Sequence, residues 1–185
     1  MQENQKKTRR IVMNAVMIGV YIALTFLTIS MGGLKITFEH FPVVLSAVVF
    51  GPVDAMLVGG IGELLNQLFT FGLTPTTALW ILPIVFRGAA LGLCARLLKK
   101  QMSASVICAK PVPVVFLIIC VISGIFSSCL NTVAFYVDSK MFGYYSYALV
   151  FGAFLTRILL SAITSVIIVI GTKAVLYALN KEHLI

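Results

Sequence analysis

Three charged residues lie inside long apolar runs of the sequence, where a charge is costly. Glu63 and Arg87 stand near the middle of such runs, and Arg157 lies about a third of the way along another. On insertion scales a charge at the centre of a membrane helix costs about 2.5 to 3.5 kcal/mol, so these residues predict a polar site. An ion pair between Glu63 and one of the two arginines leaves the other arginine without a partner. The second arginine favours a cavity for an anionic or carbonyl-rich ligand, while an ion pair that only locks the bundle stays an alternative.

Residue patterns typical of catalysis are absent from the sequence. It contains no HExxH, no GxSxG and no GxxxxGK[ST] phosphate loop. Glu63 has no second carboxylate beside it for acid–base work, and the two histidines, His40 and His183, lie far apart. The four cysteines form no CxxC pair, which favours packed thiols over a metal site. We therefore predict a binding protein that is not an enzyme and carries no metal and no cofactor.

The composition indicates that the lipid bilayer surrounds these residues. Hydrophobic residues make up 60% of the chain and charged residues 11%, whereas a soluble domain is roughly a quarter charged. A length of 185 residues is typical of one domain and leaves room for about six spans of some 20 residues. The net charge of +8 comes from basic residues at the ends of apolar segments. That is the positive-inside pattern, and it argues against nucleic acid as a partner.

We predict an all-α integral membrane protein with six transmembrane helices in a single domain, 1–185, and with both termini in the cytoplasm. Residues 1–10 form a basic leader, and the apolar run after them is too long for a signal peptide. The predicted helices include 11–31, 41–50, 53–71, 111–137 and 146–173, with a further helix that passes Pro83 and ends near 96. The external loops are 32–40, 72–77 and 136–147, and 101–110 is a cytoplasmic linker. In this topology the three buried charges lie within a turn or two of one another in depth.

Small residues recur every four positions along the first predicted helix. Ala15, Gly19 and Ala23 therefore fall on one face, where they let another helix approach closely. We call these three residues the small-residue stripe. Its spacing is equally compatible with packing inside the bundle and with docking of a partner.

Two runs of the sequence resemble a known family. They are GGLKITFEHFPVVLSAVVFGPVDAMLVGGIGELLNQL (32–68) and LTPTTALWILPIVFRGAALGL (73–93). These runs are similar to the substrate-binding S component of energy-coupling factor (ECF) vitamin transporters, and most similar to its folate group. The matching motif positions are Phe41-Pro42, Phe50-Gly51-Pro52, Gly59 and the acidic Glu63. Two positions depart from the pattern, because Asp54-Ala55 replaces a small or glycine-containing turn and Glu63 replaces the more frequent aspartate.

The resemblance implies a function. S components are multi-pass proteins of the plasma membrane that bind a vitamin from outside, with the first external loop as a lid and the outer halves of helices four to six as walls. They dock on a membrane scaffold subunit driven by two cytoplasmic ATPases, and they carry no ATPase site of their own. In this family small residues on helix one form the docking face, which implies that role for Ala15, Gly19 and Ala23. The whole component is thought to topple in the membrane during transport.

A folate ligand would divide the candidate residues between its two ends. A pterin ring requires aromatic stacking and paired hydrogen bonds, and its glutamate tail requires a cation. The candidate binding residues are Phe38, Glu63, Trp80 and Asn131 for the ring, Lys35, His40, Arg87 and Arg157 for the tail, and Tyr145 in the third external loop. Riboflavin, pantothenate or a queuosine precursor remain alternatives, although a neutral flavin leaves both arginines unexplained. A stand-alone small permease or a membrane scaffold without ligand is the alternative of a different class.

Overall fold

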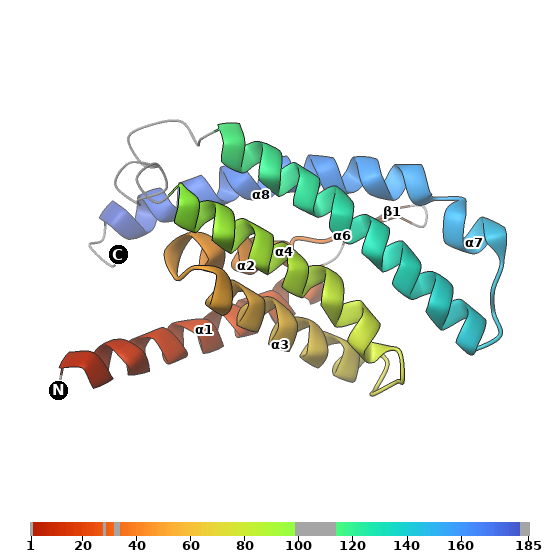
Figure 1. Ribbon diagram of the computed structural model, residues 1–185, viewed down its shortest axis with the longest axis horizontal. Coiled ribbons are helices and arrows are strands. Elements are labelled where there is room, and N and C mark those ends of the chain that lie inside the picture. The colour runs from red at the N-terminus through yellow and green to blue at the C-terminus, as the bar shows by residue number, and fades with distance from the viewer. Residues whose placement is uncertain (1, 28, 32–33, 99–113, 182–185) are drawn as a thin grey trace.

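The computed structural model describes residues 2–27, 29–31, 34–98 and 114–181. The chain order of its elements is α1 (Gln2–Phe26), β1 (Ile29–Met31), β2 (Leu34–Ile36), α2 (His40–Val49), α3 (Pro52–Thr70), α4 (Thr77–Leu97), α6 (Val114–Met141), α7 (Tyr147–Phe151) and α8 (Phe154–Lys181). The predicted cytoplasmic linker 101–110 lies outside these residues. The start of α1 and the end of α8 lie at the same end of the bundle (Figure 1).

The prediction of a helical membrane protein is confirmed for the body of the fold. In the part of the chain that the structure describes, four segments are long and apolar enough to cross a membrane: Lys7–Phe26, Thr77–Leu97, Val114–Met141 and Tyr147–Ala178. The 10 residues of α2 extend only about 15 Å, roughly half of a hydrocarbon core. Helix α3 carries Asp54 and Glu63 and is the most polar of the remaining helices. Which end of the bundle faces the cytoplasm stays a prediction.

Several predicted boundaries differ from the structure. Helix α6 continues to Met141, so the first part of the predicted external loop 136–147 is helical, and α8 continues past 173 to Lys181. The first helix ends at Phe26 and not near 31, because β1 and β2 pair antiparallel, Ile29 with Ile36 and Met31 with Leu34. Strand β2 lies within the predicted external loop 32–40, and α2 begins at its last residue, His40. The last predicted helix is broken into α7 and α8 at Gly152, where an added Cβ would lie 2.4 Å from the carbonyl oxygen of Ala148. Only glycine fits so close to the preceding turn.

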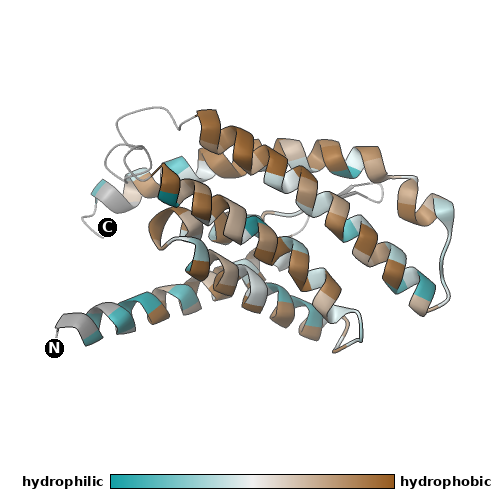
Figure 2. Cartoon of the chain, viewed as in Figure 1, coloured by the Kyte–Doolittle hydropathy of each residue, from teal (hydrophilic) through white to brown (hydrophobic). Residues whose placement is uncertain are grey.

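Helices α3, α4, α6 and α8 follow one another as packed neighbours, and α2 lies against α3, α4 and α8 in the middle of the molecule. Val43, Val44 and Ala47 of α2 are completely buried. Glycine brings α3 and α4 together, since a Cβ at Gly92 would lie 2.2 Å from Pro52 Cα. The outward faces of α4, α6 and α8 are hydrophobic, and the first turns of α1 are hydrophilic (Figure 2). Such apolar outer faces are what a bilayer requires.

Helix α1 lies at the edge of this bundle and is held there at two places. Near its start, Arg10 Nε donates to both carboxylate oxygens of Asp54 at 2.9 Å, and Asn14 Nδ2 donates to Asp54 Oδ1 at 2.6 Å. Near its end, Tyr21 is completely buried. Asp54 departs from the resembled motif, and the structure gives it a partner on α1 that a small residue could not bind.

Candidate functional site

Two adjoining cavities lie inside the bundle. The first, here called the outer cavity, has a volume of about 460 Å³ and is lined by Thr37, Glu39, His40, Trp80, Ser128, Asn131, Phe135, Arg157, Leu160, Ser161 and Thr164. The second, the inner compartment, has about 160 Å³ and is lined by Tyr21, Glu39, His40, Glu63, Gln67, Trp80, Pro83, Ile84 and Asn131. Four residues line both, so the two form one continuous chamber. Its volume lies in the range of small-molecule sites.

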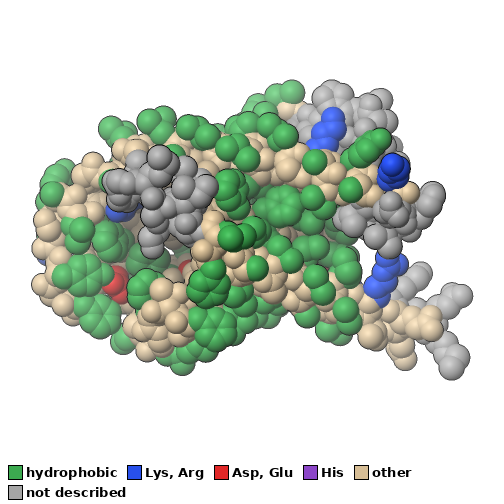
Figure 3. All heavy atoms as spheres, turned by 180° about the vertical axis from the view of Figure 1, so that it is seen from behind, with side chains coloured by type: hydrophobic (Ala, Val, Ile, Leu, Met, Phe, Trp, Pro, Cys, Tyr) green, Lys and Arg blue, Asp and Glu red, His purple; other side chains and the backbone are tan. Residues whose placement is uncertain are grey.

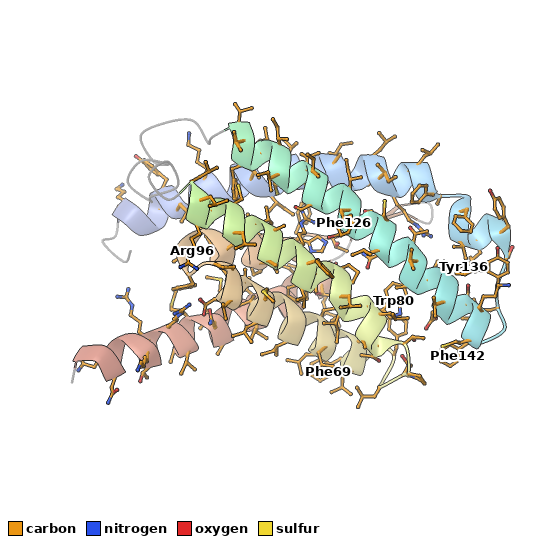
Figure 4. The ribbon with its side chains drawn as sticks, viewed as in Figure 1. Phe69, Trp80, Arg96, Phe126, Tyr136 and Phe142 are labelled. Atoms are coloured by element: carbon orange, nitrogen blue, oxygen red, sulfur yellow. The ribbon has the colours of Figure 1, made fainter. Side chains whose placement is uncertain are left out.

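The chamber lies toward one end of the molecule. Seen from behind, acidic side chains are visible at and inside a hollow at one end, while most Lys and Arg side chains lie at the end that carries the termini (Figure 3). Trp80 lies toward the same end as Tyr136 and Phe142, and Arg96 lies toward the other (Figure 4). This separation of aromatic and basic residues agrees with the predicted topology, in which the site opens outward.

Aromatic rings and an amide form one wall of the chamber. Trp80 stands one turn inside α4, and its ring centroid lies 6.3 Å from that of Phe135 on α6. Asn131 precedes Phe135 by one helical turn and therefore lies on the same face of α6. The predicted binding residues Trp80 and Asn131 thus meet across the α4–α6 interface, and both line the two cavities.

Arg157 provides the positive charge of the outer cavity. Its guanidinium carbon lies 5.3 Å from the centroid of the Phe135 ring, and Nη1 donates to the carbonyl oxygen of Val150 at 3.4 Å. Among the residues that the structure describes, no carboxylate forms an ion pair with it. A half-buried cation of this kind can take an anionic ligand without first breaking a salt bridge.

Glu63 faces the inner compartment, and its partners are neutral. Its carboxylate accepts hydrogen bonds from Tyr21 Oη at 2.8 Å, Gln67 Nε2 at 2.7 Å and Asn66 Nδ2 at 3.2 Å. The ion pair between Glu63 and an arginine, considered above as an alternative, is not formed. The acid that the motif places on α3 is therefore held by hydroxyl and amide donors, and it remains part of the chamber wall.

Arg87 is buried but lines neither cavity. Its Nη2 donates to Ser165 Oγ at 2.8 Å and lies 3.9 Å from Cys120 Sγ, and Nε has no partner. Gly124 makes this possible, because a Cβ there would lie 2.5 Å from Ser165 Oγ. Ser165 follows Ser161 of the outer cavity by one turn. Arg87 therefore lies behind the wall of the chamber, where it supplies positive charge without touching a ligand in it.

Glu39 lines both cavities and was not among the predicted binding residues. Burial raises its pKa to about 7, and the negative charge of Glu63 adds to the effect. Hydrogen bonds from Thr37 and Thr25 and the charge of Arg87 partly oppose the rise in pKa. One feature of the sequence could have identified Glu39 as a binding residue: it stands beside His40 in a polar run between apolar segments.

His40, a predicted binding residue, also lines both cavities. Burial and the nearby charge of Arg87 hold the pKa of His40 well below its ordinary range, so the imidazole is neutral. Its Nδ1 is buried without a hydrogen-bond partner. An unpartnered nitrogen at the junction of two cavities is available to a ligand.

Other predicted residues are not brought to the chamber. Tyr145 is exposed, and its ring lies 5.4 Å from that of Tyr136 and 4.6 Å from Lys140 Nζ. Phe38 does not line either cavity. The backbone of Lys35 belongs to β2, and its side chain lies outside what the structure describes. Sequence reasoning missed several residues that line the outer cavity: Thr37, Ser128, Phe135, Leu160, Ser161 and Thr164.

Comparison with known proteins places the whole chain in one family. The family model described as "ECF-type riboflavin transporter, S component" matches residues 5–181. A solved S component of a bacterial ECF transporter is 22% identical, with a TM-score of 0.62 over 91% of this chain and 96% of the other. The S component for biotin from an ECF-type ABC transporter is 17% identical, with a TM-score of 0.65 over 96% and 94%. No curated protein matches.

These matches confirm the predicted family and leave the folate group unconfirmed. The two solved structures share the fold, and their low identity gives no information on the ligand of this chain. The family model covers nearly the full length, including α6 and α8, which lie beyond the motif that suggested the family. Together with the apolar helices, this identifies a membrane component of a transporter: the chain belongs to the family of S components of ECF-type transporters.

Proposed function

We propose that this S component captures folate from outside the plasma membrane and delivers it to a membrane scaffold and its two ATPases. The observation that supports folate is the polarity of the chamber. The inner compartment is lined by two carboxyl groups, those of Glu39 and Glu63, and by no basic side chain except neutral His40. The outer cavity is lined by Arg157. Trp80 lines both cavities, and Phe135 lines the outer one beside Arg157. A ligand with a donor-rich aromatic head and an anionic tail matches this order.

The head of folate suits the acidic compartment. The pyrimidine edge of a pterin carries a ring N–H beside an amino group, and these two parallel donors fit the two oxygens of one carboxylate. Glu39 is the better candidate for this pairing, because the three donors to Glu63 already occupy much of that carboxylate. In this arrangement Trp80 provides the stacking surface, and Asn131 the amide for a remaining ring group.

The tail of folate suits the outer cavity. A glutamate carboxylate placed there would gain a charge-assisted hydrogen bond from Arg157. The hydroxyl groups of Ser128, Ser161 and Thr164 provide further donors on the same wall. Most residues that line this half of the chamber belong to α6 and α8.

Riboflavin is the second candidate, because the matching family model carries its name. The pyrimidine edge of a flavin presents one N–H between two carbonyl oxygens. Placed against Glu39 or Glu63, those oxygens would face carboxylate oxygens and repel them. A neutral flavin would also leave the charge of Arg157 without a partner. The chamber therefore favours folate over riboflavin.

Two measurements test the cargo. We expect mass spectrometry of the denatured, purified protein to identify folate as the small molecule that accompanies it. Trp80 is the single tryptophan of the chain and lines both cavities, so folate is expected to quench its fluorescence at nanomolar concentration. Riboflavin at the same concentration should leave the signal unchanged. Tight binding of riboflavin without binding of folate would show that the proposed ligand is wrong, while the assignment to the family would stand.

The proposed docking face is the small-residue stripe of α1. Ala15, Gly19 and Ala23 are all exposed, and a Cβ built at Gly19 meets no atom within 4 Å. The neighbouring apolar residues Val16 and Val20 are exposed as well. The stripe therefore does not pack inside this bundle, which leaves docking as the better of the two interpretations of its spacing.

A leucine at Gly19 is expected to weaken docking at least about tenfold, since its side chain would hold a partner helix away from the α1 backbone. The fold should tolerate it, because nothing in the protein occupies that space. Co-purification of the ATPase module measures docking, and Trp80 quenching shows that the vitamin site is intact. Ala174→Leu on the exposed side of α8 is the matched control. Normal docking of Gly19→Leu would remove the stripe from the proposed interface.

A further inference from the structure

Arg87 lies directly behind the chamber, on the side of the chain termini. On α4 it follows Pro83 and Ile84 of the inner compartment by about one turn, so these three residues share one face of the helix. On α8 its partner Ser165 follows Ser161 of the outer cavity, again by one turn. The guanidinium therefore borders the chamber from two helices without lining it.

Gly124 of α6 brings this charge close to the cavity wall. A Cβ at Gly124 would lie 3.4 Å from Arg87 Nη2 and 3.0 Å from Ser161 Oγ. Ser128, one turn further along α6, lines the outer cavity. The missing side chain at 124 thus lets the guanidinium lie against the turn of α6 that borders the chamber.

The positive charge of Arg87 is not neutralised by a neighbour. The residue is 2% exposed, and none of the carboxylates in the described part of the chain forms an ion pair with it. Its Nη2 has the neutral partners Ser165 and Cys120, and its Nε has none. A guanidinium does not lose its proton in proteins, so the full charge remains and acts through a medium of low polarity.

This charge acts on the inner compartment. Burial raises the pKa of Glu39 to about 7, and the charge of Arg87 opposes that rise. Burial lowers the pKa of His40, and the same charge lowers it further. Both residues line the inner compartment, as does Glu63. Arg87 therefore offsets part of the negative charge of two carboxyl groups from a position that the ligand does not contact.

Hydrogen-bond geometry alone does not select the head of the ligand. A neutral pterin edge and a cationic amidinium both present two parallel N–H groups to a carboxylate. Two uncompensated carboxylates would favour the cation, because it adds an ion pair to the same hydrogen bonds. Selection of the neutral head requires an element that repels the cation, and a positive charge behind the wall is such an element.

We propose that Arg87 is a specificity-determining residue that makes the inner compartment reject cationic head groups and accept neutral ones. The inference rests on the proposed function, because folate carries a neutral head of this kind. Arg87 acts on the ligand through space, since it lines neither cavity. The carboxylates provide the hydrogen-bond acceptors, and Arg87 sets the charge that the head group is allowed to carry.

The test compares two ligands that differ in the head. Folate and methotrexate share the glutamate tail, but the 2,4-diaminopteridine of methotrexate needs an added proton before it presents two parallel N–H donors to a carboxylate. Two charges about 10 Å apart, at an effective dielectric constant of about 20, change an affinity more than tenfold. In Arg87→Met we therefore expect the preference for folate over methotrexate to fall at least about tenfold. Trp80 quenching at constant pH measures both affinities.

A second pair of probes does not depend on the proposed cargo. Benzamidinium is an aromatic cation with two parallel N–H donors, and benzamide is a neutral analogue of similar size. Arg87→Met should raise the affinity for benzamidinium relative to benzamide about tenfold. Failure of the wild type to bind folate contradicts the proposed cargo, and the benzamidinium–benzamide pair then decides the inference by itself.

Matched variants separate the charge of Arg87 from its packing. Arg87→Lys keeps a positive charge and should keep the wild-type preferences. Arg96→Met removes an exposed arginine of the same helix and should leave them unchanged. Addition of Glu63→Gln to Arg87→Met removes the excess negative charge and should move the preferences back toward the wild type. Where Arg87→Met does not fold, Arg87→Gln replaces it, because an amide can still donate to Ser165.

Two results would overturn the proposal. Equal loss of affinity for both members of each pair in Arg87→Met would show that Arg87 supports the chamber wall without selecting the charge of the ligand. A change of preference in Arg87→Lys as large as that in Arg87→Met would show that the shape of the guanidinium, and not its charge, is what matters.

Discussion

Replacement of Arg157 by alanine is expected to weaken folate binding by about 30-fold to several thousandfold. Truncating one partner of a buried, hydrogen-bonded charge pair costs about 2 to 5 kcal/mol, and each 1.4 kcal/mol is a factor of ten in affinity. The guanidinium lies on the wall of the outer cavity over Phe135, with no carboxylate of the described chain paired to it. A ligand carboxylate is therefore its proposed partner. Trp80 quenching by folate measures the loss.

Two comparisons locate the effect at the ligand tail. 6-Methylpterin has no carboxylate, so Arg157→Ala and the wild type should bind it with equal affinity. The loss of affinity that is seen for folate but not for 6-methylpterin then measures the interaction between Arg157 and the ligand carboxylate. Arg157→Lys should recover part of the folate affinity, because an ammonium keeps the charge and loses the bidentate geometry. Arg96→Ala, an exposed arginine of α4 outside both cavities, is the control. Equal losses for folate and 6-methylpterin would show that Arg157 supports the chamber and does not bind the tail.

The sequence allowed us to predict how deep each charged residue lies along its helix, but not toward which neighbouring helices its side chain points. Charges in apolar runs placed Glu63, Arg87 and Arg157 at similar height, and two of the three line the chamber. Arg87 points between α4, α6 and α8, where Gly124 leaves room and Ser165 accepts its hydrogen bond. That contact depends on how closely α6 and α8 approach, which is a property of three helices together and leaves no local pattern in one.

The family could be predicted because its motif lies in helices that form the scaffold. The residues that would select the vitamin lie mostly in other helices. The two matching runs cover β2, α2 and most of α3 and α4, including the turn at Gly51-Pro52. Most of the outer cavity is lined by α6 and α8, through residues such as Ser128, Phe135 and Ser161. These helices lie outside the motif and read as ordinary apolar spans. A sequence comparison that finds the family therefore carries little information on the tail of the ligand.

The first external segment illustrates a second limit. The sequence predicts the polar run before Phe41 to be an external loop, with Lys35, Phe38 and His40 as candidate binding residues. In the structure, Lys35 belongs to the paired strand β2, and Glu39, which was not predicted, lines both cavities together with His40. Strand pairing and the insertion of α2 into the bundle set this arrangement, and both are tertiary contacts.

Folate affinity is expected to fall about a hundredfold between pH 8 and pH 5 if Glu39 binds the pterin edge. Two parallel N–H donors require an ionised carboxylate, and burial with the charge of Glu63 raises the pKa of Glu39 to about 7. Below that pKa the competent fraction of the empty protein falls tenfold per pH unit, and the apparent dissociation constant rises by the same factor. Among the groups that face Glu39, His40 stays neutral over this range because its pKa lies well below its ordinary value. Trp80 quenching across the pH series measures the dependence.

Glu39→Gln should remove this pH dependence, with weak and nearly equal affinity at pH 5 and pH 8. Asp138→Asn, which changes a carboxylate in the last turn of α6 outside both cavities, should keep it. The stability of the ligand-free protein provides an independent check, because it should fall with rising pH whereas folate affinity should rise. Because the folded-state pKa of Glu39 is above its ordinary value of 4.5, the stability it contributes is complete below pH 4.5 and is lost as pH rises through 7. The empty wild type should therefore melt lower at pH 8 than at pH 5, by on the order of 5 °C relative to Glu39→Gln. A pH-independent wild-type affinity, together with this shift in melting temperature, would show that Glu39 titrates in the chamber without binding the ligand.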